Sequence, residues 1–578
     1  MALREQLSLD DNAWIALPGM DALNQSLQNL AARLAQMGGD LTRLPLYGIP
    51  FAVKDNIDVA GLATTCACPE FAYQPERSAR VVERLVAAGA VVIGKTNLDQ
   101  FATGLVGVRS PYGAVANSFD PDYISGGSSS GSAVVVAKGL VPFALGTDTA
   151  GSGRVPAGLN NIVGLKPTCG WLSTRGVFPA CRSLDCVSVF ALTVDDADYV
   201  CRIAAAFDRE DPYSRTIGVA AGALPKHPVF AVPEQLHWFG DELAAQAFDA
   251  ALQQLAATGV TLKKIDFSPF YQTAALLYDG AWVAERYAAL EALLHSQPDV
   301  IHPVVRGIIE RANGMSALDA FKGYYRLAEC KRLVEEIYQE VDAVLVPTAP
   351  GIYRIDDVLA DPVRLNTQLG TYTNFVNLLD GCALALPAGL RADGLPFGIT
   401  VIAPAWHDAR LAEFGRRWQA AAPWTLGATG QDLPPVTPTP VIPLAIDTIP
   451  LAVVGAHLSG MPLNYQLQER GAVLLERTTT AACYRLFALA GTVPPKPGLL
   501  RVEAGTGAAI QIEIWAMPVV HFGSFVGLIP APLGIGTLTL ADGREVKGFI
   551  CEPWALADAR DISEFGGWRA YIASRNQS

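Results

Sequence analysis

Two loops rich in small hydroxyl residues flank one apolar segment of the chain: Ile124-Ser-Gly-Gly-Ser-Ser-Ser-Gly-Ser132 and Gly146-Thr-Asp-Thr-Ala-Gly-Ser-Gly-Arg-Val-Pro156. A glycine-rich loop by itself usually indicates only flexibility. Upstream, however, Lys54 ends the apolar run Gly48-Ile-Pro-Phe-Ala-Val-Lys54. Burial disfavours the charged form of a lysine, so its pKa falls and the neutral amine can serve as a base. The combination favours a catalytic role for the two loops.

The composition predicts a folded protein of more than one domain. The chain has 578 residues, of which 51% are hydrophobic and 17% charged, so a large buried core is expected. The formal net charge is −13 and there is no basic block, which argues against nucleic acid or anionic lipid as a partner.

The N-terminus and the cysteines indicate a cytoplasmic protein. Arg4, Glu5, Asp10 and Asp11 stand where a signal peptide needs an unbroken apolar core. The uncharged residues 519–541 include prolines and glycines, so we expect strands and turns there rather than a membrane helix. The ten cysteines are scattered without zinc-binding spacing, which is typical of reduced thiols. We therefore expect a soluble chain without membrane contact.

A proline-rich segment divides the chain. Residues 434–450 include six prolines, and such a segment is extended and semi-rigid. We therefore predict a large domain over residues 1–430, a linker over residues 431–450 and a small domain over residues 451–578.

The two predicted domains differ in their hydrophobic patterns. In the large one, β-branched runs at residues 90–94 and 343–347 alternate with helical apolar spacing at residues 80–88 and 241–258. This alternation predicts an α/β fold with a mixed sheet covered by helices.

The small domain is expected to be rich in strands. We predict them at residues 511–517, 536–540 and 546–550, and the turn Asp542-Gly543 between the last two predicts a hairpin.

Several catalytic patterns are missing or misleading. The seven histidines form no dense cluster, so no metal site is expected, and no Gly-x-Ser-x-Gly motif is found at a strand-to-helix turn of the α/β-hydrolase kind. The run Gly89-Ala-Val-Val-Ile-Gly-Lys-Thr96 fits the phosphate-loop pattern, but its middle residues favour a strand. We predict a strand that ends at Gly94 and no bound nucleotide.

The spacing of Lys54, Ser128 and Ser152 resembles the Ser–cis-Ser–Lys triad of the amidase signature family. The two hydroxyl-rich loops and the later Gly164-Leu-Lys-Pro-Thr168 match its signature, and the resemblance covers roughly residues 20–425. It implies that residues 1–430 form an amidase domain.

The resemblance also implies roles for individual residues. Ser152 would be the nucleophile, and Ser128, after a cis peptide bond from Gly127, would relay its proton to neutral Lys54. The backbone N–H groups of the nucleophile loop would form the oxyanion hole. These donors would be Thr149, Ala150, Gly151 and Ser152. Asp148 would either hold this loop or cap a turn in it.

A second segment bears on the substrate. If residues 274–294 form one helix, Tyr278 and Arg286 lie on roughly one side of it, and an arginine beside a phenol suits a small carboxylate. From periodicity alone, a surface arginine paired with a glutamate fits better. The stretch nevertheless resembles the one that holds the substrate carboxylate in allophanate hydrolases.

The C-terminal region resembles the C-terminal domain of allophanate hydrolases, an α+β domain related to γ-glutamyl cyclotransferases. The matching stretches are residues 452–464, 513–518 and 532–536. His457 is the candidate for proton transfer in this domain, His521 is its rival, and Glu513 would assist either one.

The resemblances together predict hydrolysis of allophanate to ammonia and carbon dioxide, in urea or s-triazine catabolism. The small domain would promote decarboxylation of the N-carboxycarbamate product. No cofactor and no metal are expected, and the family suggests a stand-alone homodimer. An amidase of broader specificity, a component of an amidotransferase complex and a non-catalytic scaffold remain as alternatives.

Overall fold

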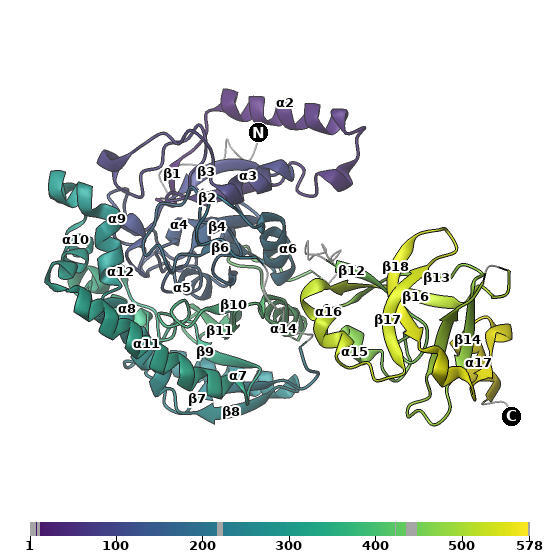
Figure 1. Cartoon of the computed structure of the whole chain (residues 1–578). Helices are drawn as coiled ribbons and strands as arrows, with labels where there is room; N and C mark the ends of the chain where they lie inside the picture. Colours follow the sequence, from purple (N-terminus) through teal and green to yellow (C-terminus); the bar gives the residue numbers. More distant parts are fainter. Residues whose placement is uncertain are drawn as a thin grey trace. The chain divides into compact units, whose positions relative to one another are not determined.

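The computed structural model describes residues 7, 12–216, 224–421, 424–434, 448–503 and 505–575. These residues form two compact units, the larger ending at residue 434 and the smaller beginning at residue 448 (Figure 1). Most of the predicted linker, residues 435–447, lies outside the described residues. Its extended form and the predicted domain boundaries therefore stay predictions.

The large unit is built on one mixed sheet of eleven strands, in the order β1-β3-β2-β4-β6-β5-β10-β11-β9-β7-β8. β2 is parallel to both β3 and β4, whereas β4 and β6 are antiparallel. The predicted α/β fold with a mixed sheet is confirmed. The strands are β1 (Trp14–Ala16), β2 (Pro50–Lys54), β3 (Val91–Thr96), β4 (Phe143–Thr147), β5 (Val163–Lys166), β6 (Val187–Ala191), β7 (Val229–Pro233), β8 (Thr261–Ile265), β9 (Ala343–Pro347), β10 (Gly381–Leu390) and β11 (Pro396–Pro404).

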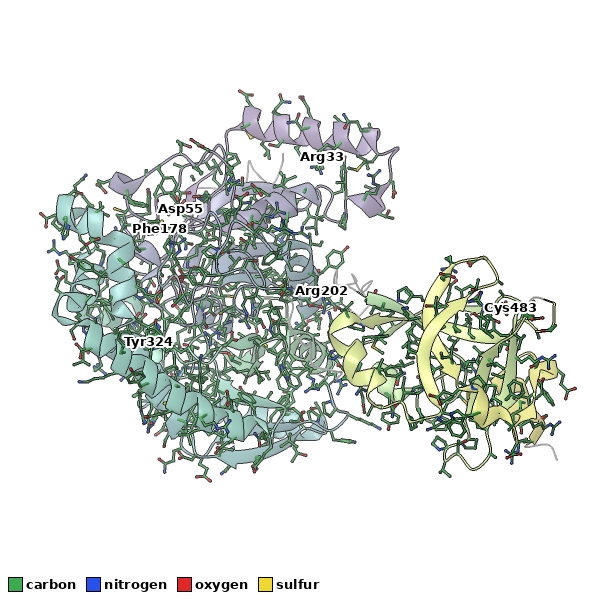
Figure 2. The ribbon with its side chains drawn as sticks, viewed as in Figure 1. Arg33, Asp55, Phe178, Arg202, Tyr324 and Cys483 are labelled. Carbon is green, nitrogen blue, oxygen red and sulfur yellow. The ribbon has the colours of Figure 1, made fainter. Side chains whose placement is uncertain are left out.

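Helices surround this sheet, and α8 to α11 cluster along one side of the unit (Figure 1). Tyr324 of α11 lies on the outer side of that cluster (Figure 2). The helices are α2 (Met20–Gln36), α3 (Arg80–Ala87), α4 (Ser130–Ala137), α5 (Val155–Leu159), α6 (Val194–Ala204), α7 (Glu242–Ala257), α8 (Ser268–Asp279), α9 (Val283–Ser296), α10 (Pro303–Glu310), α11 (Ala317–Tyr338), α12 (Ile355–Ala360), α13 (Arg364–Leu369) and α14 (Asp408–Ala420).

The predicted elements of the large unit are found in place. The runs at residues 90–94 and 343–347 are in β3 and β9, and the two predicted helices are α3 and α7. The segment that fits the phosphate-loop pattern is a strand, as expected, but β3 continues past Gly94, where we expected it to end, through Thr96. Its Lys95 Nζ lies 3.1 Å from a carboxylate oxygen of Asp55 in a fully buried ion pair. Lys95 is therefore part of the buried core of the unit and is paired with a carboxylate there.

The apolar segment between the two hydroxyl-rich loops forms the centre of the unit. Every residue of α4 and of β4 is buried, so this helix is enclosed on all sides, as expected for a core helix. The first loop leads into α4, and β4 leads out into the second loop, which ends at α5. Both loops are therefore anchored to buried elements, the first to α4 and the second to β4 and α5.

The small unit contains a five-stranded sheet, ordered β13-β16-β12-β18-β17, and a three-stranded sheet, ordered β15-β14-β19. The predicted hairpin is present, since β17 and β18 pair from Thr539↔Glu545 onward and Gly543 has φ +86°. The elements are β12 (Thr448–Val453), α15 (Tyr465–Gln468), β13 (Val473–Thr479), β14 (Tyr484–Ala488), β15 (Pro497–Arg501), β16 (Gln511–Pro518), α16 (Val519–Val526), β17 (Leu533–Thr539), β18 (Glu545–Cys551), β19 (Arg560–Asp561) and α17 (Trp568–Arg575).

One prediction for the small unit was wrong in part. Residues 519–541 were expected to form strands and turns, yet their first part is the helix α16. Pro518 precedes the first turn, and Phe525 is buried against the ring of Phe549, so packing on one side overrides the valine and glycine content. No helix in the described ranges is both long and apolar enough to cross a membrane.

Candidate active site

Lys54, at the end of β2, is fully buried beside two hydroxyl groups. Its Nζ lies 2.7 Å from Ser128 Oγ and 2.7 Å from Thr147 Oγ1. Burial lowers the pKa of Lys54 to about 7, although the nearby carboxylates, Asp99 foremost, favour the charged form. Near neutral pH a large fraction of this amine is therefore uncharged and able to accept a proton.

Ser128 follows a cis peptide bond from Gly127 and is also fully buried. Gly127 admits no side chain, because a Cβ there would lie 2.2 Å from Asp99 Oδ2 and 2.7 Å from the backbone nitrogen of Gly107. Asp99 itself accepts the backbone N–H groups of Val106, Gly107 and Arg109. The turn that presents Ser128 is thus packed against a firmly held carboxylate.

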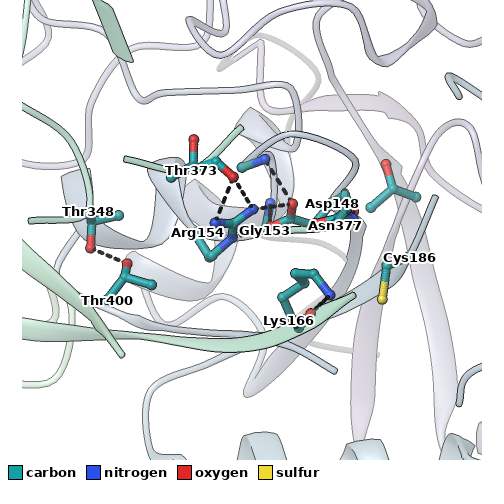
Figure 3. A network of polar contacts seen from close by, with 12 residues as sticks. Asp148, Gly153, Arg154, Lys166, Cys186, Thr348, Thr373, Asn377 and Thr400 are labelled. Carbon is teal, nitrogen blue, oxygen red and sulfur yellow. Dashed lines mark hydrogen bonds and ion pairs between the residues drawn. The ribbon is translucent and has the colours of Figure 1, made fainter. Parts of the chain in front are cut away.

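Ser152 lies in the second loop, which Asp148 and Arg154 hold together. The guanidinium of Arg154 donates two hydrogen bonds to the Asp148 carboxylate, at 2.8 and 2.9 Å (Figure 3). Although burial opposes it, the charge of Arg154 keeps the pKa of Asp148 below its usual value. Asp148 also accepts the backbone N–H groups of Gly151 and Gly153. It therefore holds the loop, as one of its two predicted roles required.

The four predicted oxyanion donors are not equivalent. The N–H of Gly151 already donates to Asp148 at 2.8 Å. Within the described ranges, the N–H groups of Thr149, Ala150 and Ser152 have no acceptor, although these residues are at most 4% exposed. Buried backbone N–H groups normally have partners, so three unpaired donors in one turn suit an oxyanion.

Tyr278 and Arg286 do not share one helix, contrary to the prediction. The helical conformation is interrupted at Gly280, so Tyr278 lies near the end of α8 and Arg286 belongs to α9. Gly280 is extended, and a Cβ on it would lie 2.4 Å from the carbonyl oxygen of Leu276. The two side chains meet all the same, with Arg286 Nη2 3.4 Å from the Tyr278 hydroxyl.

Arg286 is a buried cation rather than a surface one. It is 2% exposed, its Nη1 donates to Thr103 Oγ1 at 3.1 Å, and its guanidinium lies 5.3 Å from the centroid of the Tyr278 ring. No carboxylate among the described residues forms an ion pair with it. The neighbouring Glu285 instead accepts two hydrogen bonds from Ser183. The surface arginine–glutamate alternative is therefore wrong.

The nucleophile loop and the arginine site lie close together. Ala150 belongs to the same hydrophobic cluster as Trp282 and Leu277, and Tyr278 packs against that cluster. Sequence reasoning did not single out Thr147, Thr103 or Asp185 in this region. A small polar residue next to a matched motif is a signal for Thr147, whereas Thr103 and Asp185 carry none.

No hydrogen bond among the described residues joins the three candidates of the small unit to one another. His457 lines a cavity of about 210 Å³ together with Lys496, and its ring stacks on Phe549 while Nε2 lies 2.9 Å from Gln466 Oε1. Burial lowers the pKa of His457, so the ring is neutral near pH 7. His521 is in α16, where its carbonyl oxygen accepts a hydrogen bond from the Ser524 hydroxyl.

Glu513 lines a different cavity, of about 340 Å³. Its carboxylate accepts hydrogen bonds from Arg477, Arg569 and Ser459, and no hydrogen bond in the described part of the chain joins it to either histidine. Burial raises the pKa of Glu513, but the bonds from Ser459 and the two arginines outweigh it and lower the pKa. In this structure Glu513 pairs with the two arginines, and its assistance to His457 or His521 stays a prediction.

Groups of three or more histidine, cysteine, aspartate or glutamate side chains that could hold a metal ion do not occur among the described residues.

Comparison with known families assigns both parts of the chain. Residues 9–412 match the family model described as Amidase. Residues 449–573 match the model described as Allophanate hydrolase C-terminal domain.

Individual relatives agree with this assignment. A solved structure of Kluyveromyces lactis allophanate hydrolase is 44% identical, with a TM-score of 0.86, over 99% of this chain and 95% of that one. The urea amidolyase of Saccharomyces cerevisiae is 46% identical over 97% of this chain, which spans only 31% of that longer protein. A glutamyl-tRNA(Gln) amidotransferase component from Treponema pallidum is 34% identical, over 69% of this chain and 88% of that one.

The amidotransferase component matches only about two thirds of the chain, whereas the Kluyveromyces lactis enzyme matches both units. The chain therefore belongs to the amidase family and, within it, to the allophanate hydrolases.

Proposed function

We propose that this chain hydrolyses allophanate, releasing ammonia from the terminal amide. The observation that carries the proposal is Arg286, a buried guanidinium with only hydroxyl partners among the described residues. A buried charge is costly unless it is paired, so an anionic substrate group is its natural partner. Because Tyr278 and Ala150 share a hydrophobic cluster, that anion would lie beside the nucleophile loop.

The contact between Lys54 Nζ and Ser128 Oγ supports an acyl transfer in two stages. Neutral Lys54 accepts the proton of Ser128, Ser128 accepts that of Ser152, and Ser152 Oγ attacks the amide carbon. The N–H groups of the nucleophile loop stabilise the oxyanion. The carbon–nitrogen bond then breaks, the relayed proton leaves with ammonia, and water cleaves the acyl-enzyme to N-carboxycarbamate.

The small unit offers a site for a second step. The cavity that contains His457 also contains Lys496, a cation suited to a small dicarboxylate such as N-carboxycarbamate. A neutral histidine there can donate or accept a proton as carbon dioxide leaves. We propose that this cavity promotes the decarboxylation, which yields carbamate and then the second ammonia.

The decisive experiment measures ammonia release from allophanate by Ser152→Ala and by Ser188→Ala. Ser188 lies against Gly153 of the same loop, but its buried hydroxyl has no hydrogen-bond partner in the described residues, so it is a matched control. We expect Ser152→Ala to be inactive and Ser188→Ala to retain most of the activity. Full activity in Ser152→Ala, after contamination is excluded, refutes the mechanism.

Two alternatives have their own tests. An amidase of broad specificity would hydrolyse uncharged small amides as well as allophanate. A component of an amidotransferase complex would copurify with partner chains and need them for activity. The 34% identity to the amidotransferase component covers only 69% of this chain, which favours the hydrolase.

The remaining expectations complete the proposal. A homodimer is tested by light scattering of the purified chain, and a cytoplasmic location by fractionation of the source cells. Whether the substrate comes from urea or from s-triazine breakdown is decided by which compound induces expression.

A further inference from the structure

The loop of residues 180–186 anchors the side chain of Thr149. The Asp185 carboxylate accepts the Thr149 hydroxyl at 2.5 Å and the backbone N–H groups of Ala180 and Cys181 at 2.9 and 3.1 Å. A carboxylate fixed by two N–H groups of its own loop is a rigid acceptor. Thr149 is therefore tied to a carboxylate that cannot follow it if it moves.

The backbone of the same loop is bound to the start of the nucleophile loop. The N–H of Asp148 donates to the carbonyl of Cys186 at 2.7 Å. The side-chain amide of Asn377 bridges the carbonyls of Asp148 and Leu184, both at 2.7 Å. Two further contacts thus hold residue 148 in register with the loop.

The loop is also bound to the helix that carries the arginine. Ser183 donates its backbone N–H, at 2.9 Å, and its hydroxyl to Glu285, the residue before Arg286. The thiol of Cys181 contacts the carbonyl oxygen of Trp282 at 3.8 Å. One short loop therefore contacts both the first turn of α9 and the residues that present the oxyanion donors.

We infer that Asp185 is a positioning residue, which holds the Thr149 side chain and thereby aims the unpaired N–H groups of Thr149 and Ala150 at the developing oxyanion. The inference rests on the proposed function, because it needs Ser152 as nucleophile. Asp185 touches no reacting atom. Asp185 acts by fixing the orientation of Thr149. Because the same loop also binds Glu285, next to Arg286, it fixes Thr149 relative to the arginine.

The chain offers a matched set of variants for the test. Thr149→Val keeps the shape of the side chain and removes its hydroxyl, whereas Thr149→Ser keeps the hydroxyl. Asp185→Asn weakens the acceptor. Thr193→Val removes a hydroxyl from another threonine–aspartate pair, the α6 cap in which Thr193 donates to Asp196 at 2.7 Å.

We expect Thr149→Val to lower kcat for allophanate roughly 10- to 100-fold with KM nearly unchanged, because only the transition state is affected. Thr149→Ser should restore most of the loss. Asp185→Asn should lose a similar amount, and the double variant should be no worse than either single one. Thr193→Val should lower the melting temperature and leave kcat unchanged.

A fluorophosphonate supplies an independent readout, since it reacts with Ser152 without using Arg286. Its rate of labelling should fall in Thr149→Val and not in Thr193→Val. The inference is overturned if Thr149→Val melts early yet keeps wild-type kcat and labelling rate, or if it raises only KM. If Ser152→Ala remains active in the same assay, the proposed function fails instead, and the two failures are distinguishable. Should Asp185→Asn not fold, the Thr149 pair decides alone.

Discussion

Two buried ionisable groups, Lys54 in the large unit and Glu513 in the small unit, have opposite surroundings. In the large unit the hydrogen-bond partners of Lys54 among the described residues are both hydroxyl groups, and burial lowers its pKa to about 7. In the small unit the Glu513 side chain is also buried, yet two arginines and Ser459 keep it ionised. A group left without an opposite charge can exchange protons at neutral pH, whereas a fully paired one contributes structure. The contrast distinguishes a buried group suited to proton transfer, Lys54, from one that contributes structure, Glu513.

The largest effect is expected at Lys54. Both Lys54→Met and Lys54→Arg should lower ammonia release by at least about 10³-fold, because neither provides a neutral amine. In the wild type, kcat/KM should rise with pH through about 7, as the amine loses its proton. A Lys54→Arg variant with substantial activity would show that the charge, not the base, is what matters.

The same residue should carry a measurable cost in stability. The pKa of Lys54 is lowered on folding, so between about 7 and the unfolded value the unfolded chain binds more protons. Stability contributed at this site therefore rises with pH over that range and is lowest below about 7. Lys54→Met should raise the melting temperature more at pH 6 than at pH 10. The corresponding difference in the free energy of unfolding is at most about 5 kcal/mol.

A smaller effect is expected at Arg286. Arg286→Met should lower kcat/KM for allophanate about 10- to 150-fold, the cost of a charge-assisted hydrogen bond. Uncharged amides should lose little, and Tyr278→Phe should lose only a few-fold. Equal losses on charged and uncharged amides would assign Arg286 to folding.

His457 is expected to affect only the second step. His457→Ala should leave the release of the first ammonia intact and slow the decay of N-carboxycarbamate about 10-fold or more. Carbon-13 NMR with labelled allophanate follows the intermediate directly. The comparable substitution His521→Ala serves as the control, and an unchanged decay in His457→Ala would move the second step elsewhere.

The smallest effect is expected at Glu513, on stability alone. Its pKa is lowered on folding, so its contribution is fully present above the unfolded value and is lost as pH falls through the folded one. Glu513→Gln should lower the melting temperature at pH 7, which corresponds to a loss of roughly 1 to 3 kcal/mol in the free energy of unfolding. The stability of the small unit should then depend less on pH in the acid range. Slowed N-carboxycarbamate decay in this variant, at unchanged stability, would break the contrast between the two units.

What the sequence predicted well is local in the chain. The strands β3 and β9 and the helices α3 and α7 follow from periodicity, and the contact of Lys54 with Ser128 joins two runs whose patterns mark them. The catalytic role of Ser152 stays a prediction. The missed contacts are distant ones: Thr149 meets Asp185 across 36 residues and Arg286 meets Thr103 across 183. A stretch of sequence short enough to show a motif or the period of one helix does not contain both members of such a pair.

Two errors have a common physical cause. The break at Gly280 and the helix α16 both depend on a few atoms of packing, a carbonyl oxygen in the first and a buried phenylalanine in the second. Periodicity averages over many positions and does not register such contacts. Even so, Tyr278 and Arg286 meet across the Gly280 break, as the prediction of a single helix required.

The buried setting of Arg286 determines how the enzyme responds to its medium. A guanidinium out of contact with solvent is screened little by dissolved salt, so ionic strength alone should scarcely change the reaction. An anion must enter the site to compete, and planar carboxylates match the guanidinium fork better than spherical halides do. Inhibition should therefore follow the shape of the anion: formate and acetate should act as competitors at concentrations where chloride does not. A carboxylate buffer would then raise the apparent KM for allophanate, whereas a chloride salt would not.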